Sequence, residues 1–380
     1  MRDDAGLPEQ QPRLGPLGEK FDGVERIAVL RGGALGDLIS ALPALDALAA
    51  AYPAATLTLL GTPQHRLLLQ GRNGPVETVE ILPIVPGVRE PAGPPGANGA
   101  AAPTVDDFFQ RMRERHFDLA VQLHGGGGNS NPFLLRLGAR YTVGCATPDA
   151  PRLDRNLQFS YYQHELLRWL EVAGLAGAPA VRLHPRLAVS EEERETARQW
   201  IEPDTRGLVS LHPGASDPRR RWPARHFGLT AARLAEAGFQ VLVIGDGPDV
   251  DLADQVVAEA HGAGPAAAVR AVRSVAGKLE LPVLAGLLAS SAVMLGNDSG
   301  PRHLAQAVGA RTASIYWCGN VINAGPLSRS EHRLQISWTV SCPVCGASMA
   351  GERGGRCGHD VSFVADVDPE AVLADVLALV

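Results

Sequence analysis

The stretch RIAVLRGGALGDLISALPALDALAAAYPAATLTLL, residues 26–60, decides the fold class of this chain. It begins with the apolar run RIAVL, which is typical of a buried strand, and passes through a glycine turn. Residues 37–51 then carry leucines at helical spacing, and residues 55–60 form a second apolar run. Strand, helix and strand in this order predict a βαβ unit with parallel strands.

The same alternation continues on both sides of a charged stretch at 185–205, which we interpret as a hinge or linker. The fold class is therefore α/β, with two Rossmann-like domains that each hold a parallel sheet. We expect a loose arm at 1–24, domains at 25–190 and 205–365, and a terminal helical segment at 366–380. Further strands are expected at 117–123, 208–211, 239–244, 292–295 and 312–316, and helices at 223–237, 250–260, 282–290, 302–308 and 369–379.

Composition excludes several function classes. The 380 residues hold 35 Lys and Arg against 41 Asp and Glu, a net charge of −6, which argues against a nucleic-acid partner. No window offers the roughly 18 apolar residues of a membrane span, and the polar start lacks the apolar core of a secretory signal. We expect a cytoplasmic protein, with at most peripheral contact at the inner face of the membrane.

The glycine turn RGGALGDL, residues 31–38, is close to a dinucleotide fingerprint but does not fit it. The first glycine of that fingerprint would fall at Arg31, and no acid follows the second strand to bind a ribose. The turn instead places Asp37 at the start of a helix. Its carboxylate either complements the helix dipole or faces a ligand as a general base.

Two further motifs follow strand ends. In HPGASDPRRRWP, residues 212–223, three arginines stand beside a helix start, which favours a diphosphate site over a solvated basic turn. In GNDSGPRH, residues 296–303, the backbone N–H groups of Ser299 and Gly300 would point at an anion. Asp298 would cap the helix or orient a cation, and His303 would either join the site or be a partly buried histidine.

Two other strand ends carry weaker signals. In GDGPDVD, residues 245–251, we favour a helix cap for Asp249 over a contact with a nucleotide ribose. In HGGGGNSNP, residues 124–132, Asn129 and Asn131 are candidate hydrogen-bond donors to an acceptor substrate.

A cysteine cluster lies near the C-terminus. Cys342, Cys345, Cys357 and His359 place four potential zinc ligands within eighteen residues. We favour a cysteine-bearing loop without a metal, and the zinc site stays as the alternative.

Taken together, three stretches resemble glycosyltransferase family 9, the ADP-heptose:lipopolysaccharide heptosyltransferases. They are residues 26–60, HPGASDPRRRWPARHF at 212–227, and LLASSAVMLGNDSGPRHLAQAVGARTASIY at 287–316. The resemblance covers about residues 25–320. It implies the GT-B architecture, in which two Rossmann-like domains face across a cleft and the last helix often crosses back to the N-terminal domain.

The resemblance also implies an activity and a set of site residues. The activity is inverting transfer of a sugar, foremost heptose from ADP-heptose, to a hydroxyl of a glycan or glycolipid such as lipopolysaccharide core, with no required cofactor. Asp37 matches the proposed base, and Arg220 matches a family lysine, with Arg221 beside it. Asp298, Ser299, Gly300 and His303 match the segment that lines the donor phosphates. A sugar-nucleotide epimerase of the same architecture and a non-catalytic sugar-nucleotide-binding protein are the alternatives.

Overall fold

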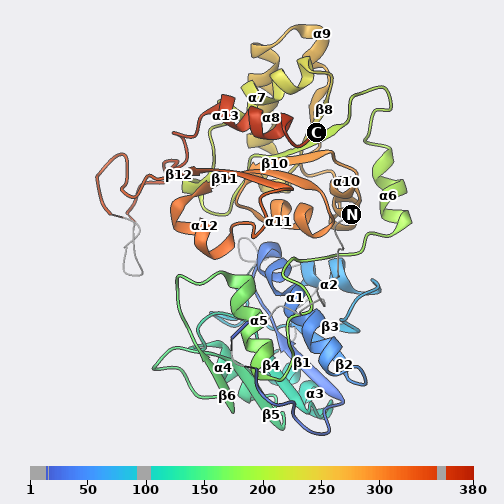
Figure 1. The fold of residues 1–380 in the computed structure, drawn as a ribbon, viewed down its shortest axis with the longest axis vertical. Coiled ribbons are helices and arrows are strands. Elements are labelled where there is room, and N and C mark those ends of the chain that lie inside the picture. Colours follow the sequence, from blue (N-terminus) through green and yellow to red (C-terminus); the bar gives the residue numbers. More distant parts are fainter. Residues whose placement is uncertain (1–13, 16, 92–103, 349–356) are drawn as a thin grey trace, which may run out of the picture. The chain divides into compact units, whose positions relative to one another are not determined.

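The computed structural model describes residues 14–15, 17–91, 104–348 and 357–380. The chain divides into two compact units, each drawn as a ribbon in Figure 1. Unit 1 comprises residues 1–33, 40–160 and 165–185, and unit 2 comprises residues 34–39, 161–164 and 186–380. Most of the predicted arm at 1–24 lies outside the described residues. Its described part is not loose, because the N–H of Gly18 donates to the carbonyl of Gly174 at 2.9 Å.

Unit 1 is built on a parallel six-stranded sheet with the order β3-β2-β1-β4-β5-β6. The βαβ prediction is confirmed, since Ile27 of β1 pairs in parallel with Leu57 of β2 and also with Leu119 of β4. The strands are β1 (Arg26–Leu30), β2 (Thr56–Gly61), β3 (Thr78–Ile81), β4 (Leu119–Gln122), β5 (Tyr141–Ala146) and β6 (Arg155–Gln158), and the helices are α1 (Leu35–Ala51), α2 (Pro63–Leu69), α3 (Val105–Glu114), α4 (Ser130–Leu135) and α5 (Glu165–Leu175).

Unit 2 repeats this plan with the order β12-β11-β10-β7-β8-β9. In both sheets the strand order reverses at the middle, next to β1 and next to β7, and ligands of parallel sheets bind at such switch points. The strands are β7 (Leu208–His212), β8 (Gln240–Val243), β9 (Val272–Ser274), β10 (Val293–Asn297), β11 (Arg311–Trp317) and β12 (His332–Ser337), and the helices are α6 (Glu191–Arg198), η1 (Pro218–Arg220), α7 (Ala224–Glu236), η2 (Gly247–Asp249), α8 (Val250–Ala263), α9 (Ala266–Val269), α10 (Leu281–Ala289), α11 (Gly300–Ala307), α12 (Cys318–Ala324) and α13 (Pro369–Leu377).

The last helix does not cross back to unit 1. In the described structure α13 packs against α7, β11 and β12 of unit 2. Its apolar face, which includes Val372 and Val376, is buried in the same core as Phe227 and Trp222. The expectation of a crossing helix is therefore wrong, because this core already buries the one apolar face that α13 has to cover.

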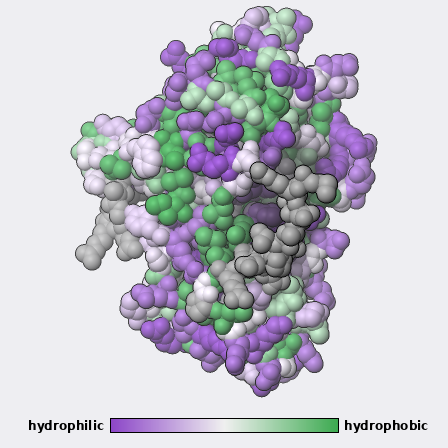
Figure 2. All heavy atoms as spheres, in the orientation of Figure 1, coloured by the Kyte–Doolittle hydropathy of each residue, from purple (hydrophilic) through white to green (hydrophobic). Residues whose placement is uncertain are grey.

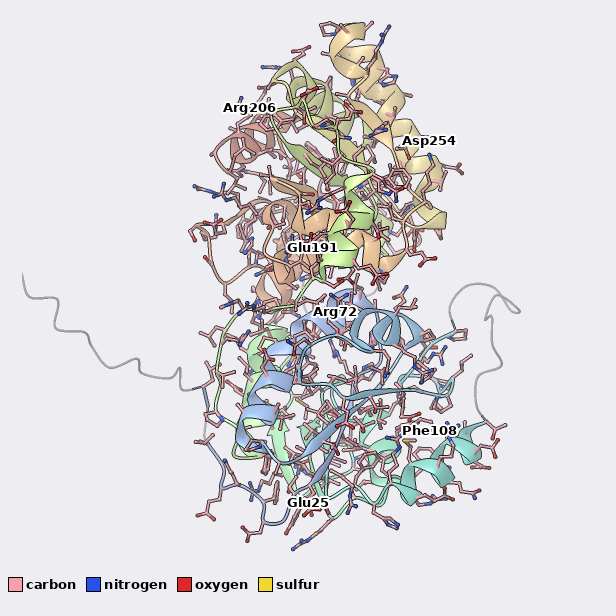
Figure 3. The ribbon with its side chains drawn as sticks, turned by 90° about the vertical axis from the view of Figure 1, so that its right-hand side faces the viewer. Glu25, Arg72, Phe108, Glu191, Arg206 and Asp254 are labelled. Atoms are coloured by element: carbon pink, nitrogen blue, oxygen red, sulfur yellow. The ribbon has the colours of Figure 1, made fainter. Side chains whose placement is uncertain are left out.

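The charged stretch predicted as a linker contains a helix of unit 2. Helix α6 begins with a capping box, in which the side chains of Ser190 and Glu193 satisfy each other's backbone N–H groups. The helix packs on α10, and its Ala197 is buried while Glu191 points outward (Figure 3). The acidic residues that suggested a linker thus form the solvated face of a packed helix.

No helix in the described ranges is long and apolar enough to cross a membrane. Figure 2 shows polar and apolar residues interspersed on the face drawn, with an apolar group over α12. Ile322 of α12 is 52% exposed, and Trp338, just after β12, is 70% exposed. These exposed apolar residues lie in the part of unit 2 that leads into the cysteine cluster.

Candidate functional site

The switch point of unit 2 brings three of the sequence motifs together. Strands β7 and β10 are neighbours, with Gly296 opposite His212 in the parallel register. The arginine-bearing loop at 213–222 follows β7, and Asp298 follows β10. Helix α11 then begins at Gly300, so a helix N-terminus, an acid and an arginine loop share one edge of the sheet.

Asp298 is the centre of this group and is only 3% exposed. Its Oδ2 accepts hydrogen bonds from Nη1 of Arg220 and Nδ2 of Asn320, both at 2.9 Å. Its Oδ1 lies 3.1 Å from Nε2 of His303. Burial would raise the pKa of Asp298, but the hydrogen bond and charge of His303 and the charge of Arg220 outweigh it and hold that pKa well below its ordinary value. Asp298 is thus a fixed anion that orients its neighbours.

The N-terminus of α11 is not capped by a side chain of the described residues, since the hydroxyl of the N-cap residue Ser299 is used elsewhere. Its Oγ lies 2.9 Å from Nδ1 of His212. The first N–H groups of a helix without a cap are donors for an anion. The alternative in which Asp298 or Ser299 caps the helix is therefore not what the structure shows.

Asp249 also differs from its predicted role as a cap. Within the described part of the chain, neither its side chain nor that of Asp246 makes a capping hydrogen bond. Oδ2 of Asp249 lies 3.2 Å from Nε2 of His212. Burial would raise the pKa of Asp249, but the hydrogen bond and charge of His212 lower it. His212 therefore joins Asp249 to Ser299, a link that the sequence interpretation missed although a polar residue ending an apolar strand is a recognisable signal.

The three arginines of the loop have different contacts. Arg219 is held by Asp217, to which it donates from its backbone N–H at 3.0 Å, from Nε at 3.0 Å and from Nη2 at 2.5 Å. Arg221 donates from Nε to the carbonyl of Ala215 at 2.9 Å. Arg220 alone of the three is paired with Asp298 in the described structure, and its side chain is 21% exposed. The loop therefore presents Arg220 at the site while Arg219 shapes the turn.

Arg302 is a cation that the sequence interpretation did not single out. It is fully buried in α11, where Nη1 donates to Oε1 of Gln306 at 3.0 Å and the guanidinium lies 5.3 Å from the ring of Tyr316. None of the ion pairs found among the described residues gives Arg302 a carboxylate partner. A buried positive charge beside His303 adds to the positive potential at the start of α11.

The turn that carries Asp37 groups with unit 2. Gly36 lies so near the ring of His303 that a Cβ on this glycine would be 3.1 Å from Cδ2 of the histidine. Asp37 itself is half-buried, and its Oδ2 accepts a hydrogen bond from the N–H of Ala34 at 2.7 Å. The carboxylate thus closes the glycine turn at the start of α1, and its role as a base stays a proposal.

The two candidate acceptor contacts in unit 1 have different surroundings. Asn131 is fully buried, and its Nδ2 donates to the carbonyls of Cys145 at 3.0 Å and Pro151 at 2.9 Å. These bonds give Asn131 a structural role in holding its loop, which conflicts with its expected role as a donor to substrate. Asn129 is exposed and its amide lies against Gly87. It therefore stays the candidate hydrogen-bond donor to an acceptor substrate in this loop.

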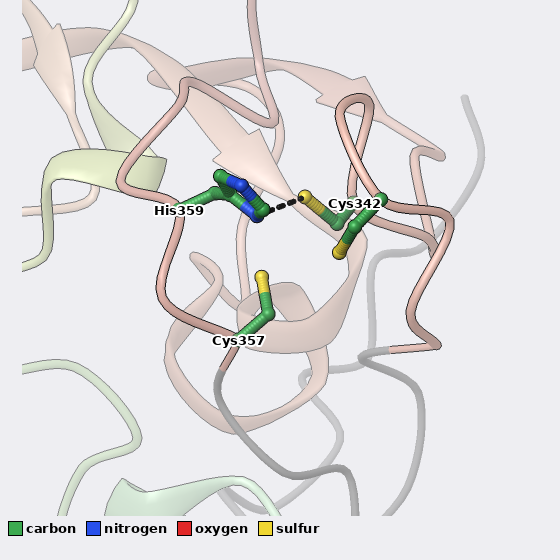
Figure 4. Close-up of side chains that lie close together, drawn as sticks. Cys342, Cys357 and His359 are labelled. Atoms are coloured by element: carbon green, nitrogen blue, oxygen red, sulfur yellow. Dashed lines mark hydrogen bonds between the residues drawn. The ribbon is translucent and has the colours of Figure 1, made fainter.

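The cysteine cluster is assembled in unit 2. The ligand atoms of Cys342, Cys345, Cys357 and His359 all lie within 4.8 Å of one another (Figure 4). This group could hold a metal ion.

Solved structures share this fold. Escherichia coli ADP-heptose lps heptosyltransferase II superposes with a TM-score of 0.70 at 20% identity, covering 93% of this chain and 98% of that one. The E. coli heptosyltransferase WaaC with ADP superposes with a TM-score of 0.61 at 16% identity, covering 82% of this chain and 92% of that one. Two parallel α/β units of this kind define the GT-B class of glycosyltransferases.

The chain belongs to glycosyltransferase family 9 (heptosyltransferase), whose family model matches residues 105–343. Lipopolysaccharide heptosyltransferase 2 of E. coli K12 is 27% identical over 203 residues, which are 53% of this chain and 55% of that protein. The chain thus spans about half the length of this and other curated relatives. The family resemblance expected from the sequence is confirmed.

Proposed function

We propose that the protein is an inverting heptosyltransferase that moves heptose from ADP-heptose to a hydroxyl of a lipopolysaccharide core glycan. The observation that carries this proposal is the buried carboxylate of Asp298 between Arg220 and His303 at the start of α11. A diphosphate needs cations and N–H donors fixed before it arrives, and this arrangement supplies both. The names of the family and of its relatives, which are heptosyltransferases, support the choice of sugar.

The donor diphosphate is proposed to lie over the N–H groups of Ser299 and Gly300. Arg220 and His303, oriented by Asp298, face its oxygens, and Arg221 adds a second guanidinium beside them. The ribose is placed against Asp249, whose carboxylate is a hydrogen-bond acceptor for ribose hydroxyls. The solved structure of WaaC with ADP supports adenine as the base.

Transfer is proposed to proceed by one displacement. Asp37 accepts the proton of the acceptor hydroxyl as its oxygen forms a bond to the anomeric carbon from the face opposite the diphosphate. The bond from that carbon to the phosphate oxygen breaks, ADP leaves, and the configuration at the carbon inverts. The negative charge that grows on the leaving phosphate is proposed to be met by Arg220, Arg221 and His303.

Fewer residues are proposed to contact the acceptor substrate than the nucleotide-sugar donor. A lipopolysaccharide precursor is a glycolipid, so we propose that the protein works at the inner face of the membrane through peripheral contact. Asn129 in the loop after β4 is the proposed hydrogen-bond donor to this acceptor.

The experiment is turnover of ADP-heptose with and without a heptose-free core acceptor, together with the melting temperature in the presence of ADP, UDP and GDP. We expect release of ADP only when the acceptor is present, and the largest stabilisation with ADP, because a ligand of the folded state raises the melting temperature. Conversion of ADP-heptose to an isomer without acceptor would identify an epimerase instead. Stabilisation by ADP without turnover on core acceptors would favour a sugar-nucleotide-binding protein.

A further inference from the structure

The cysteine cluster lies where the chain turns back after β12. The first two ligands lie in the turn CPVC at 342–345, and the other two lie in a later segment of the chain at 357–359. Sγ of Cys342 lies 3.8 Å from Nδ1 of His359, although 17 residues separate them. Figure 4 shows the labelled thiols of Cys342 and Cys357 and the imidazole of His359, which come from these two segments, directed toward one another. The convergence is therefore a property of the tertiary structure and not of one short turn.

The turn that holds the first two thiols has a defined backbone. The N–H of Cys342 donates to the carbonyl of Ala347, and the N–H of Gly346 donates back to the carbonyl of Cys342, both at 2.9 Å. Gly346 has a φ of +71°, a left-handed conformation that glycine adopts without strain. The backbone N–H groups of Cys345 and Val344 hydrogen-bond the Sγ of Cys342. The turn therefore holds the first thiol in a fixed position.

The apolar core around the cluster is small in the part of the chain that the structure describes. The apolar group around it has only Cys342 and Phe363 as fully buried members among the described residues, with Trp317 and Cys357 partly buried beside them. Val344, inside the turn, is 59% exposed. A loop with so small a core needs a further constraint to hold one conformation. Four ligand atoms at one point are such a constraint when a metal ion joins them.

We propose that Cys342, Cys345, Cys357 and His359 bind one Zn²⁺ ion as a closed structural site that braces the arginine loop. Three thiolates and one imidazole are a ligand set of structural zinc, which is tetrahedral. With bonds of about 2.3 Å to sulfur and 2.0 Å to nitrogen, such ligands lie about 3.5–3.8 Å apart. The separations here, all within 4.8 Å, need to close by about 1 Å at most.

The residues that follow His359 form hydrogen bonds with the arginine loop. The Oγ of Ser362 donates to the carbonyl of Arg221 at 2.6 Å, and the N–H of Phe363 donates to the carbonyl of Arg219 at 2.7 Å. These two bonds hold the backbone on either side of Arg220, the residue paired with Asp298. The Oγ of Ser337 at the end of β12 in turn donates to the carbonyl of Phe363 at 2.6 Å. A metal bound by His359 would therefore anchor the chain just before Ser362 and Phe363, the residues that hold the backbone around Arg220.

The metal itself is tested on the full-length protein, purified under reducing conditions and analysed for zinc and iron. We expect one equivalent of zinc, and on replacement by Co²⁺ the absorption spectrum of a tetrahedral cobalt–thiolate centre. Cys345→Ser, at an exposed ligand, should lose the bound zinc and the cobalt–thiolate spectrum. Cys318→Ser, at a cysteine outside the cluster, should keep the bound zinc and the spectrum. Only trace zinc in the wild type with no cobalt spectrum, or stoichiometric iron in place of zinc, would overturn the site.

The brace is tested by ADP affinity, and this part rests on the proposed function. Removal of zinc by a chelator, or Cys345→Ser, should weaken ADP binding about tenfold, in the range measured for residues that support a site indirectly. Re-addition of Zn²⁺ to the chelated wild type should restore the affinity, which controls for misfolding. Unchanged ADP affinity in the zinc-free protein would overturn the brace. A zinc-loaded protein that binds no ADP would instead contradict the proposed function and leave the metal site standing.

Discussion

Nη1 of Arg220 lies 2.9 Å from Oδ2 of Asp298, which stands 78 residues further along the chain. The carboxylate is buried, and its other oxygen faces His303, so the acid holds two side chains of the site at once. Because these two side chains are oriented by a fixed anion, they need not reorganise when a phosphate arrives. Substitution of either Arg220 or Asp298 should therefore have a measurable effect.

Arg220→Ala should lower kcat by about 10²–10³-fold, the range found when one preorganised donor to a developing charge is removed. Arg220→Lys should recover part of the loss, because the ammonium keeps the charge but not the two-pronged guanidinium. Steady-state kinetics with ADP-heptose measure both variants. Arg225→Ala, at an exposed arginine in the first turn of α7, is the matched control and should leave kcat unchanged. Near-normal kcat in Arg220→Ala would place the anion site elsewhere.

The stabilising effect of Asp298 should depend on pH with a defined sign. Its pKa is depressed in the folded protein, so its ionised form stabilises the fold at pH above the ordinary value of about 3.9, and this stability is lost as the pH falls through the folded-state pKa. Asp298→Asn should reduce the free energy of unfolding by about 3 kcal/mol at pH 7, since it removes the buried carboxylate that pairs with the partly buried Arg220. Urea unfolding of wild type and variant should show this difference shrinking only below about pH 4. A difference that is constant down to pH 2 would contradict the prediction.

Asp37→Asn should abolish transfer while sparing ADP binding. The amide can still accept the hydrogen bond from the N–H of Ala34 that closes the turn, but it cannot take a proton from the acceptor. General-base catalysis contributes about 10²–10⁴-fold, and a loss of kcat of that size is expected. Turnover assays measure the loss of transfer, and ADP titration measures whether nucleotide binding is kept. Turnover within a few fold of wild type would exclude Asp37 as the base.

Asp249→Asn should weaken binding of ADP about tenfold and narrow the difference in affinity between ADP and 2′-deoxy-ADP. A carboxylate that accepts from a ribose hydroxyl discriminates against the nucleotide that lacks it. Calorimetric titration of both nucleotides measures the effect. Asp251→Asn, at an exposed acid in the first turn of α8, is the control, and equal effects of the two variants would argue against a specific ribose contact.

Asn129→Ala should raise the KM for the core acceptor several-fold and leave the KM for the donor unchanged. Asn131→Ala should instead lower the melting temperature, because it removes the buried donor to the carbonyls of Cys145 and Pro151. Kinetics and thermal unfolding of the two variants separate these roles. An unchanged acceptor KM in Asn129→Ala would remove the loop from the acceptor site.

Local sequence patterns were enough for the two α/β units, for many of the strands and helices, and for the family. The apolar run of β1 and the leucine spacing of α1 are set by neighbours in the chain, so a short window reveals them. The patterns failed where packing decides the outcome. Helix α6 looked like a linker because only Ala197 is buried, and α13 looked free to cross until its apolar face proved to be covered by the core of unit 2.

The sequence by itself determined which chemical groups the protein carries: arginines after β7, an acid and a histidine around the start of α11, and three cysteines with a histidine near the end. Only the tertiary structure decided that Arg220 and not Arg219 meets Asp298, that His212 links Asp249 to Ser299, and that Asn131 is buried. The physical reason is the distance along the sequence over which each kind of interaction acts. Periodicity and turn chemistry act over a few residues, whereas an ion pair between strand ends depends on which strands become neighbours, and that order is set by the packing of the whole sheet.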